Sequence, residues 1–228
     1  MFYDLHAHTA ASIGENKLEE MANMAKRLGF DGIAIVSYFP DIIDVKQVEG
    51  IDIINAVMLK PANVQELEKL ISKARPKAEL LYVHGGNYDI NRAACESPAV
   101  DMLCHPELGR KDSGIDHIVI KLAAENNVAT EVNFREILES HGRNRSNILS
   151  SMRTNIMLAN KYEAKVIATS GAVNIWGMRA GRELAAFLNL MGMDLGESLD
   201  AMSNIPKKMI AENREKLAGK RREGVIEE

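Results

Sequence analysis

Short apolar runs alternate with longer amphipathic segments along most of the chain. The runs that we expect to form buried parallel strands are 2–5, 32–36, 51–59, 80–83, 100–103, 128–132 and 165–169. Between them, apolar residues such as Leu18, Met21 and Ala25 recur at three- and four-residue spacing, which is typical of a helix with one buried face. Strands separated by helices of about 10 to 15 residues predict βαβ units and a parallel sheet.

The number of these units, and the absence of a break in composition between them, predict one TIM-like (β/α) barrel of seven to eight units, an α/β fold. A doubly wound open sheet has the same order of elements and is the alternative. We expect a single barrel domain at residues 1–211. Residues 212–228 carry many charges and few apolar side chains, so we expect them to form a flexible C-terminal tail.

Composition narrows the class of protein. Hydrophobic residues make up 46% and charged residues 26% of the 228 residues, as in ordinary globular domains. The net charge of −4 excludes a generally basic nucleic-acid-binding coat but leaves room for local basic patches. No apolar run approaches the roughly 18 residues of a membrane span, and Asp4 interrupts the apolar core that a signal peptide would need. Cys95 and Cys104, as free thiols, fit a reducing cytosol, so we expect a cytoplasmic protein.

Histidines stand at the C-terminal ends of several predicted strands, the end at which barrel proteins carry their function. His6 and His8 end the first strand, His84 ends the fourth, and His105 follows the fifth. Side chains two apart on a strand point to the same face, so His6 and His8 could chelate a metal. For any one of these histidines, a hydrogen bond to a loop is the simpler interpretation.

The segment Asp4-Leu5-His6-Ala7-His8 resembles the opening motif of PHP-type metal-dependent phosphoesterases, which fold as distorted seven-stranded barrels. The resemblance implies an Asp-His pair after the second strand and an Asp-x-His after the seventh. This chain has Ser37-Tyr38 and Ser170-Gly171-Ala172 at those places. Hydrolysis by a metal cluster needs an organised ligand set, so we expect no metal here. The vestigial candidates that remain are His6, His8, His84, His105 and Glu131.

Basic residues follow the same strand ends. They are Arg92, Arg110, Arg135, Arg143, Arg145, Arg179 and Arg182, of which we expect Arg143 and Arg145 to lie in a loop. The guanidinium fork binds phosphate with two parallel hydrogen bonds, so arginines that converge would make an RNA-binding surface. A single arginine in an exposed loop is more often only solvated. Trp176 could stack on a base, but packing against a neighbouring helix is the simpler expectation.

Six motifs in order resemble the archaeal ribonuclease P protein component 3 family, whose eukaryotic relatives are the thirty-kilodalton subunits of ribonuclease P and ribonuclease MRP. The motifs are YVHGG at 82–86, INRAACE at 90–96, DMLCHPE at 101–107, GRNRS at 142–146, ATSGA at 168–172 and WGMR at 176–179. Their order and number make this resemblance more specific than any single motif.

The resemblance implies a PHP-related barrel that has lost the metal chemistry. It implies a protein subunit of ribonuclease P, the ribonucleoprotein endonuclease that removes 5′ leaders from precursor tRNA. The RNA subunit would cleave with its own Mg²⁺, and this chain would supply no catalytic residue and no cofactor. The implied partners are ribonuclease P RNA, protein component 2, the other protein subunits and, in the holoenzyme, precursor tRNA.

By position, the family resemblance also implies RNA contacts at Arg92, Arg110, His117, Lys161 and Arg179. The subunit would support and stabilise the catalytic RNA together with protein component 2. Two alternatives stay open: a metal-dependent phosphoesterase of the PHP type, and a barrel that binds only a protein partner.

Overall fold

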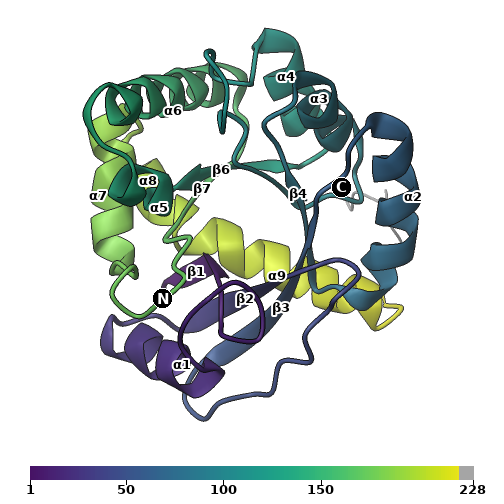
Figure 1. Cartoon of the computed structure of the whole chain (residues 1–228), viewed down its shortest axis with the longest axis vertical. Helices are drawn as coiled ribbons and strands as arrows, with labels where there is room; N and C mark the ends of the chain where they lie inside the picture. The colour runs from purple at the N-terminus through teal and green to yellow at the C-terminus, as the bar shows by residue number, and fades with distance from the viewer. Residues whose placement is uncertain (221–228) are drawn as a thin grey trace.

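Seven parallel strands form one sheet that follows the order of the chain and curves into a nearly closed barrel (Figure 1). The computed structural model describes residues 1–220. The strands are β1 (Tyr3–Ala7), β2 (Gly32–Tyr38), β3 (Asp52–Leu59), β4 (Leu80–His84), β5 (Met102–Cys104), β6 (Ala129–Asn133) and β7 (Val166–Thr169). An isolated parallel bridge between Ala7 and Ala172 draws β1 and β7 together. The predicted barrel is confirmed, and the open sheet is not the fold.

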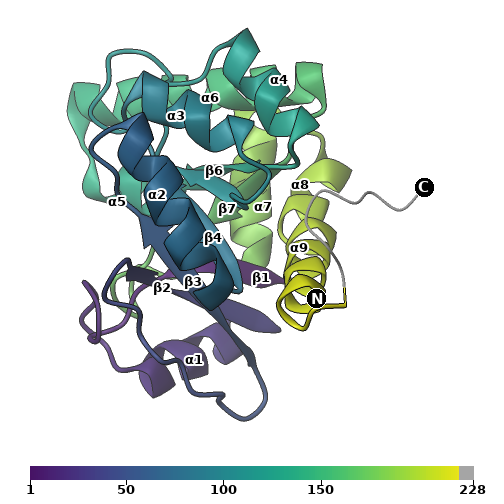
Figure 2. The same ribbon diagram turned by 90° about the vertical axis from the view of Figure 1, so that its right-hand side faces the viewer.

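Helices surround the barrel (Figures 1 and 2). They are α1 (Leu18–Arg27), α2 (Val64–Ala74), α3 (Tyr88–Glu96), α4 (His117–Glu125), α5 (Phe134–Glu139), α6 (Gly142–Tyr162), α7 (Gly181–Met191), α8 (Leu195–Ala201) and α9 (Asn204–Leu217), with a 3₁₀ turn η1 (Arg75–Lys77) after α2. Asn63, Asn87 and Asp116 each accept a hydrogen bond from a first-turn backbone N–H, which fixes the starts of α2, α3 and α4. Within residues 1–220, no helix is both long enough and apolar enough to span a bilayer.

Two apolar layers stabilise the barrel because its strands are buried on both faces. Side chains such as Leu5, Tyr82 and Met102 fill the barrel interior. Alternate positions such as Ile33 and Leu103 pack outward against the helices. The continuous apolar runs of the sequence follow from this double burial.

Helix α9 closes the end of the barrel at which the strands begin. Met209 and Ile210 of this helix are buried and belong to the interior apolar cluster. Asn213 is also buried, and its Nδ2 donates to Asp101 Oδ1 at 2.7 Å, just before β5. The last helix is therefore an integral part of the core.

Ion pairs fix the far end of α9. The Arg214 guanidinium donates through Nη1 and Nη2 to the two carboxylate oxygens of Asp52 at the start of β3, both at 2.9 Å. Its Nε donates to Glu79 Oε1, also at 2.9 Å. These contacts raise the pKa of Arg214, first through the hydrogen bond to Asp52. The guanidinium thus joins two neighbouring strands to the closing helix.

The predicted boundary between domain and tail, placed after residue 211, is wrong. Residues 212–217 continue α9, because polar side chains that looked solvated in sequence pair with carboxylates at the strand starts. The rest of the predicted tail, from residue 221 onward, lies outside the described residues.

Three short helices were not expected, namely α3, α5 and α8. Helix α3 carries Arg92. Helix α5 begins directly after β6, where Asn133 Oδ1 accepts from the Arg135 backbone N–H at 3.0 Å. The expectation that Arg143 and Arg145 lie in a loop is wrong, since both stand in the first turns of α6.

Candidate functional site

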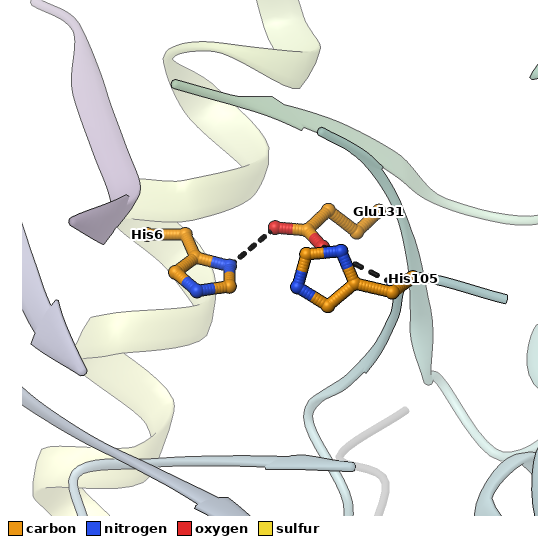
Figure 3. A group of neighbouring side chains, drawn as sticks. All are labelled: His6, His105 and Glu131. Atoms are coloured by element: carbon orange, nitrogen blue, oxygen red, sulfur yellow. Dashed lines mark hydrogen bonds and ion pairs between the residues drawn. The ribbon is translucent and has the colours of Figure 1, made fainter. Parts of the chain in front are cut away.

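The mouth of the barrel, the end at which the strands finish, contains a buried cluster of histidines and carboxylates (Figure 3). His6 of β1, His105 after β5 and Glu131 of β6 each offer one ligand-type atom, and these atoms lie within 4.8 Å of one another. The histidine groups at the strand ends are thus brought together as the sequence predicts. Glu131 lies at the centre of the cluster.

Glu131 accepts hydrogen bonds from four groups around it. His6 Nδ1 and Thr169 Oγ1 each lie 2.6 Å from Oε1, and Asn133 Nδ2 lies 3.1 Å from the same oxygen. The backbone N–H of His105 donates to Oε2 at 3.3 Å. Burial acts to raise the pKa of Glu131, but the charges of His6 and His105 and these hydrogen bonds outweigh it and hold the pKa far below its usual range. Glu131 is therefore a carboxylate.

A chain of hydrogen bonds joins His6 of β1 to His8, which directly follows the strand. Burial, followed by the charge of His6, lowers the pKa of His8 to about 2, so His8 is neutral. Its Nδ1–H donates to the Val36 carbonyl at 3.2 Å, which leaves Nε2 as an acceptor for His6 Nε2–H at 3.1 Å. His6 also donates from Nδ1 to the Glu131 carboxylate. Both ring nitrogens of His6 therefore face a hydrogen-bond partner inside the cluster.

His105 forms a second charged pair at the mouth. Its backbone has a φ of 52°, a left-handed conformation that is uncommon outside glycine. Its Nδ1 lies 2.5 Å from Glu136 Oε1 on α5. Burial acts to lower the pKa of His105, but the carboxylates of Glu131 and Glu136 outweigh burial and raise it. His84 differs, since burial and the charge of His105 lower its pKa to about 4.

This donor set does not fit the metal centre of a PHP-type enzyme. Both ring nitrogens of His6 are already engaged, Nδ1 with Glu131 Oε1 and Nε2 with His8 Nε2. Tyr38, the last residue of β2, stacks on the His8 ring with the centroids 5.9 Å apart. After β7, a Cβ at Gly171 would come within 2.2 Å of Asn133 Oδ1, so that place has no room for a ligand side chain. The cluster is instead a set of buried ion pairs with matched hydrogen bonds.

Four of the five residues expected to contact RNA lie on one side of the molecule, on or beside α3, α4 and α6. Arg92 is on α3, Arg110 precedes α4, His117 is the first residue of α4, and Lys161 is in the last turn of α6. Helix α4 packs against both α3 and α6, as Figure 2 shows. We call this side the α3–α4–α6 surface.

A hollow of about 220 Å³ lies between the start of α3 and the loop that precedes α4. Arg110 lines this hollow and is held by Asp112 through two hydrogen bonds of 2.6 and 2.9 Å. Arg92 is exposed and pairs with Glu96 one turn further along the helix at 2.9 Å. The exposed pair is weak, so Arg92 can exchange Glu96 for another anion at little cost.

Lys121 completes this surface and was missed in the sequence. It is exposed on α4, one helical turn after His117, and its Nζ lies 5.2 Å from the centroid of the Tyr162 ring. Lys161 Nζ lies 5.3 Å from the same centroid. The two ammonium groups therefore share one aromatic ring between α4 and α6. The four-residue spacing from His117 was the signal that could have revealed Lys121.

Arg179 lies apart from the other four residues, on the loop between β7 and α7. Its guanidinium carbon stands 5.2 Å from the centroid of the Phe134 ring on α5. Trp176, on the same loop, has 77% of its surface exposed. The expectation that Trp176 packs against a helix is therefore wrong.

The fold and the mouth together define a TIM-like barrel whose histidine cluster is held by hydrogen bonds. Histidinol phosphate phosphatase from Lactococcus lactis shares this fold with a TM-score of 0.52 at 10% identity, and the match covers 93% of each chain. That likeness concerns the fold alone.

Closer relatives give the family. The sequence model of RNase P subunit p30 matches residues 1–218. Ribonuclease P protein component 3 of Methanosarcina mazei is 37% identical over 217 residues, which cover 93% of this chain and 90% of that protein. A chain of archaeal ribonuclease P, solved by cryo-EM with mature tRNA, matches with a TM-score of 0.78 at 28% identity and covers 98% of this chain and 97% of that chain. The chain therefore belongs to the RNase P subunit p30 family and is a protein subunit of ribonuclease P.

Proposed function

We propose that this chain is a non-catalytic subunit that supports the RNA of ribonuclease P together with protein component 2. The family match over residues 1–218 is the observation that carries the proposal. The similar chain in the particle solved with mature tRNA supports partners that include RNA, precursor tRNA and further protein subunits. Free buried thiols at Cys95 and Cys104 are in keeping with a cytoplasmic particle.

We further propose that the α3–α4–α6 surface is the main phosphate-binding face. Arg92, His117, Lys121 and Lys161 are exposed on it, and none of their side chains is buried in an ion pair. Each phosphate contact that is lost should reduce the slope of log affinity against log salt concentration by about 0.7 to 0.9. This face therefore predicts a salt-dependent interaction despite the negative net charge of the chain.

The histidine cluster has a structural role in this proposal, and the chain needs no metal of its own. The contacts of the His6 ring with Glu131 and His8 support this role, because they occupy both ring nitrogens. Mg²⁺ would belong to the RNA subunit. Metal analysis of the purified chain should then find no stoichiometric transition metal, whereas a phosphoesterase would retain one.

The test is processing of a precursor tRNA at a Mg²⁺ concentration too low for the RNA to act alone. The assay compares the RNA subunit alone, the RNA with component 2, and the RNA with component 2 and this chain. We expect cleavage only in the last mixture. Absence of any stimulation by the chain would contradict the proposed function.

Two matched double variants compare the effect on RNA binding of removing lysines from the α3–α4–α6 surface and from α2. Lys121→Ala with Lys161→Ala should weaken RNA binding and reduce the salt slope. Lys69→Ala with Lys73→Ala removes the same charge from exposed positions on α2 and should leave both unchanged. Equal behaviour of the two double variants would contradict the assignment of the face while leaving the subunit role intact.

A further inference from the structure

The loop between β7 and α7 presents the only tryptophan of the chain to solvent. Trp176 has 77% of its surface exposed, the largest exposed fraction among the large apolar side chains of residues 1–220. A large aromatic side chain in this position leaves much apolar area in water unless a partner covers it. Contacts on both sides of the loop hold its backbone in place.

Hydrogen bonds fix the loop before any partner arrives. Asn174 Oδ1 accepts from the backbone N–H groups of Trp176 at 3.2 Å and Gly177 at 3.0 Å. Asn174 Nδ2 donates to Glu15 Oε2 at 3.0 Å, and Asn16 Oδ1 accepts from the Ile175 backbone N–H at 3.1 Å. The loop is thus joined to the segment after β1. A loop backbone held in this way loses little conformational entropy when the loop binds a partner.

Arg179 holds the other side of the loop. Its Nη1 donates to the carbonyls of Trp176 at 3.0 Å and Met178 at 2.7 Å. The guanidinium lies over the Phe134 ring, which in turn packs edge-on against Phe187 with the centroids 5.5 Å apart. Within residues 1–220, Nε and Nη2 of Arg179 make no hydrogen bond. Half of the guanidinium fork is therefore used to hold the loop, and half is available.

We propose that Trp176 stacks on an unpaired base of the RNA and that Asn174 and Arg179 fix the loop that presents it. The available N–H donors of Arg179 would bind the phosphate of the same nucleotide. An outward ring beside a guanidinium with unused donors matches the base and phosphate of one nucleotide, whereas a pocket on a protein partner would take the ring alone. The inference rests on the proposed function, and it gives Arg179 a role different from that of the α3–α4–α6 surface.

Intrinsic fluorescence tests the stacking directly, because all tryptophan emission of this chain comes from Trp176. The full chain is mixed with a component 2 whose own tryptophans are replaced by phenylalanine, and ribonuclease P RNA is then added. We expect the RNA to quench the emission without a shift to shorter wavelength. A shift to shorter wavelength on addition of component 2 alone would overturn the proposal, since the ring would then lie in a protein interface.

Binding of the same RNA by variants of the chain distinguishes the contact made by the Trp176 ring from the fixing of its loop. Trp176→Leu keeps an apolar side chain but loses the aromatic face, so affinity should fall about 5- to 150-fold with an unchanged salt slope. Asn174→Ala removes no charge and should reproduce part of that loss. The matched control is Ile13→Ala, which truncates an exposed apolar side chain on the adjoining segment and should have no effect.

Two results would overturn the inference. Wild-type affinity in Trp176→Leu would exclude stacking while leaving the subunit role intact. Wild-type affinity in Asn174→Ala, with a loss in Trp176→Leu, would exclude the need for a fixed loop. If the wild-type chain with component 2 neither binds the RNA nor stimulates processing, the proposed function and this inference both fail.

Discussion

Replacement of Glu131 by glutamine should destabilise the protein more than any other single isosteric change at the barrel mouth. The variant keeps the size of the side chain but removes the charge that faces His6 and His105. In addition, an amide NH₂ in the place of Oε2 would face the His105 backbone N–H, which is also a donor. Removal of one partner from a buried ion pair costs about 3–5 kcal/mol, or roughly 6–20 °C in Tm for a chain of this size.

The assay is urea unfolding of wild type and variant followed by circular dichroism at pH 7. Glu139→Gln makes the same chemical change on α5, where the side chain is 62% exposed and pairs with Arg135 at 3.9 Å. It should cost less than about 0.5 kcal/mol. Equal stability of the two variants would refute the conclusion that Glu131 is a buried carboxylate at the centre of the cluster.

The pH dependence gives an independent check. The folded-state pKa of Glu131 is lowered, so its contribution is present above the unfolded value of 4.5 and is lost as pH falls. The difference between wild type and Glu131→Gln should therefore shrink by about 1.4 kcal/mol for each pH unit below 4.5. A difference that grows on acidification would contradict this account.

Two further predictions concern opposite ends of the barrel. The pKa of His8 is lowered to about 2, so its contribution is complete above 6.5. Below 6.5, the free energy of unfolding should fall by about 1.4 kcal/mol per pH unit from this group, and urea midpoints of wild type and His8→Gln measured between pH 7 and 5 check this loss. At the other end, Arg214→Ala removes the bidentate pair with Asp52, and because the side chain is 38% exposed we expect a loss of about 1–2 kcal/mol. Arg214→Lys should recover less than half of this loss, and an unchanged urea midpoint in Arg214→Ala would show that the pair does not hold α9.

The sequence predicted the strands well because each is buried on both faces and appears as an unbroken apolar run. It missed α5 because six residues are too few to show a helical period. Helix α3 was missed although Asn87 is a suitable N-cap and Ile90 and Ala94 are one turn apart. The tail was misjudged because Arg214 looked solvated, and its carboxylate partners are more than a hundred residues away.

The site was predictable in part for the same reasons. Because both residues stand at the C-terminal ends of parallel strands, the sequence was enough to predict that His6 and His105 lie close together. Their hydrogen bonding was not predictable, because it depends on Glu131 and on Glu136 of the unexpected helix α5. Arg179 holds its loop through contacts with backbone carbonyls. Every residue has such a carbonyl, so the sequence contains no signal for this role.

Closure of the barrel by α9 has a consequence for how the chain folds. Arg214 is 162 positions from Asp52, and Asn213 is 112 positions from Asp101, so the final contacts of the core have very high contact order. On the ribosome, the seven strands emerge long before α9. During synthesis, the interior apolar cluster and the carboxylates at the strand starts stay uncovered until α9 has been made. Docking of α9 is therefore a slow step, and the nascent barrel is exposed to aggregation before it.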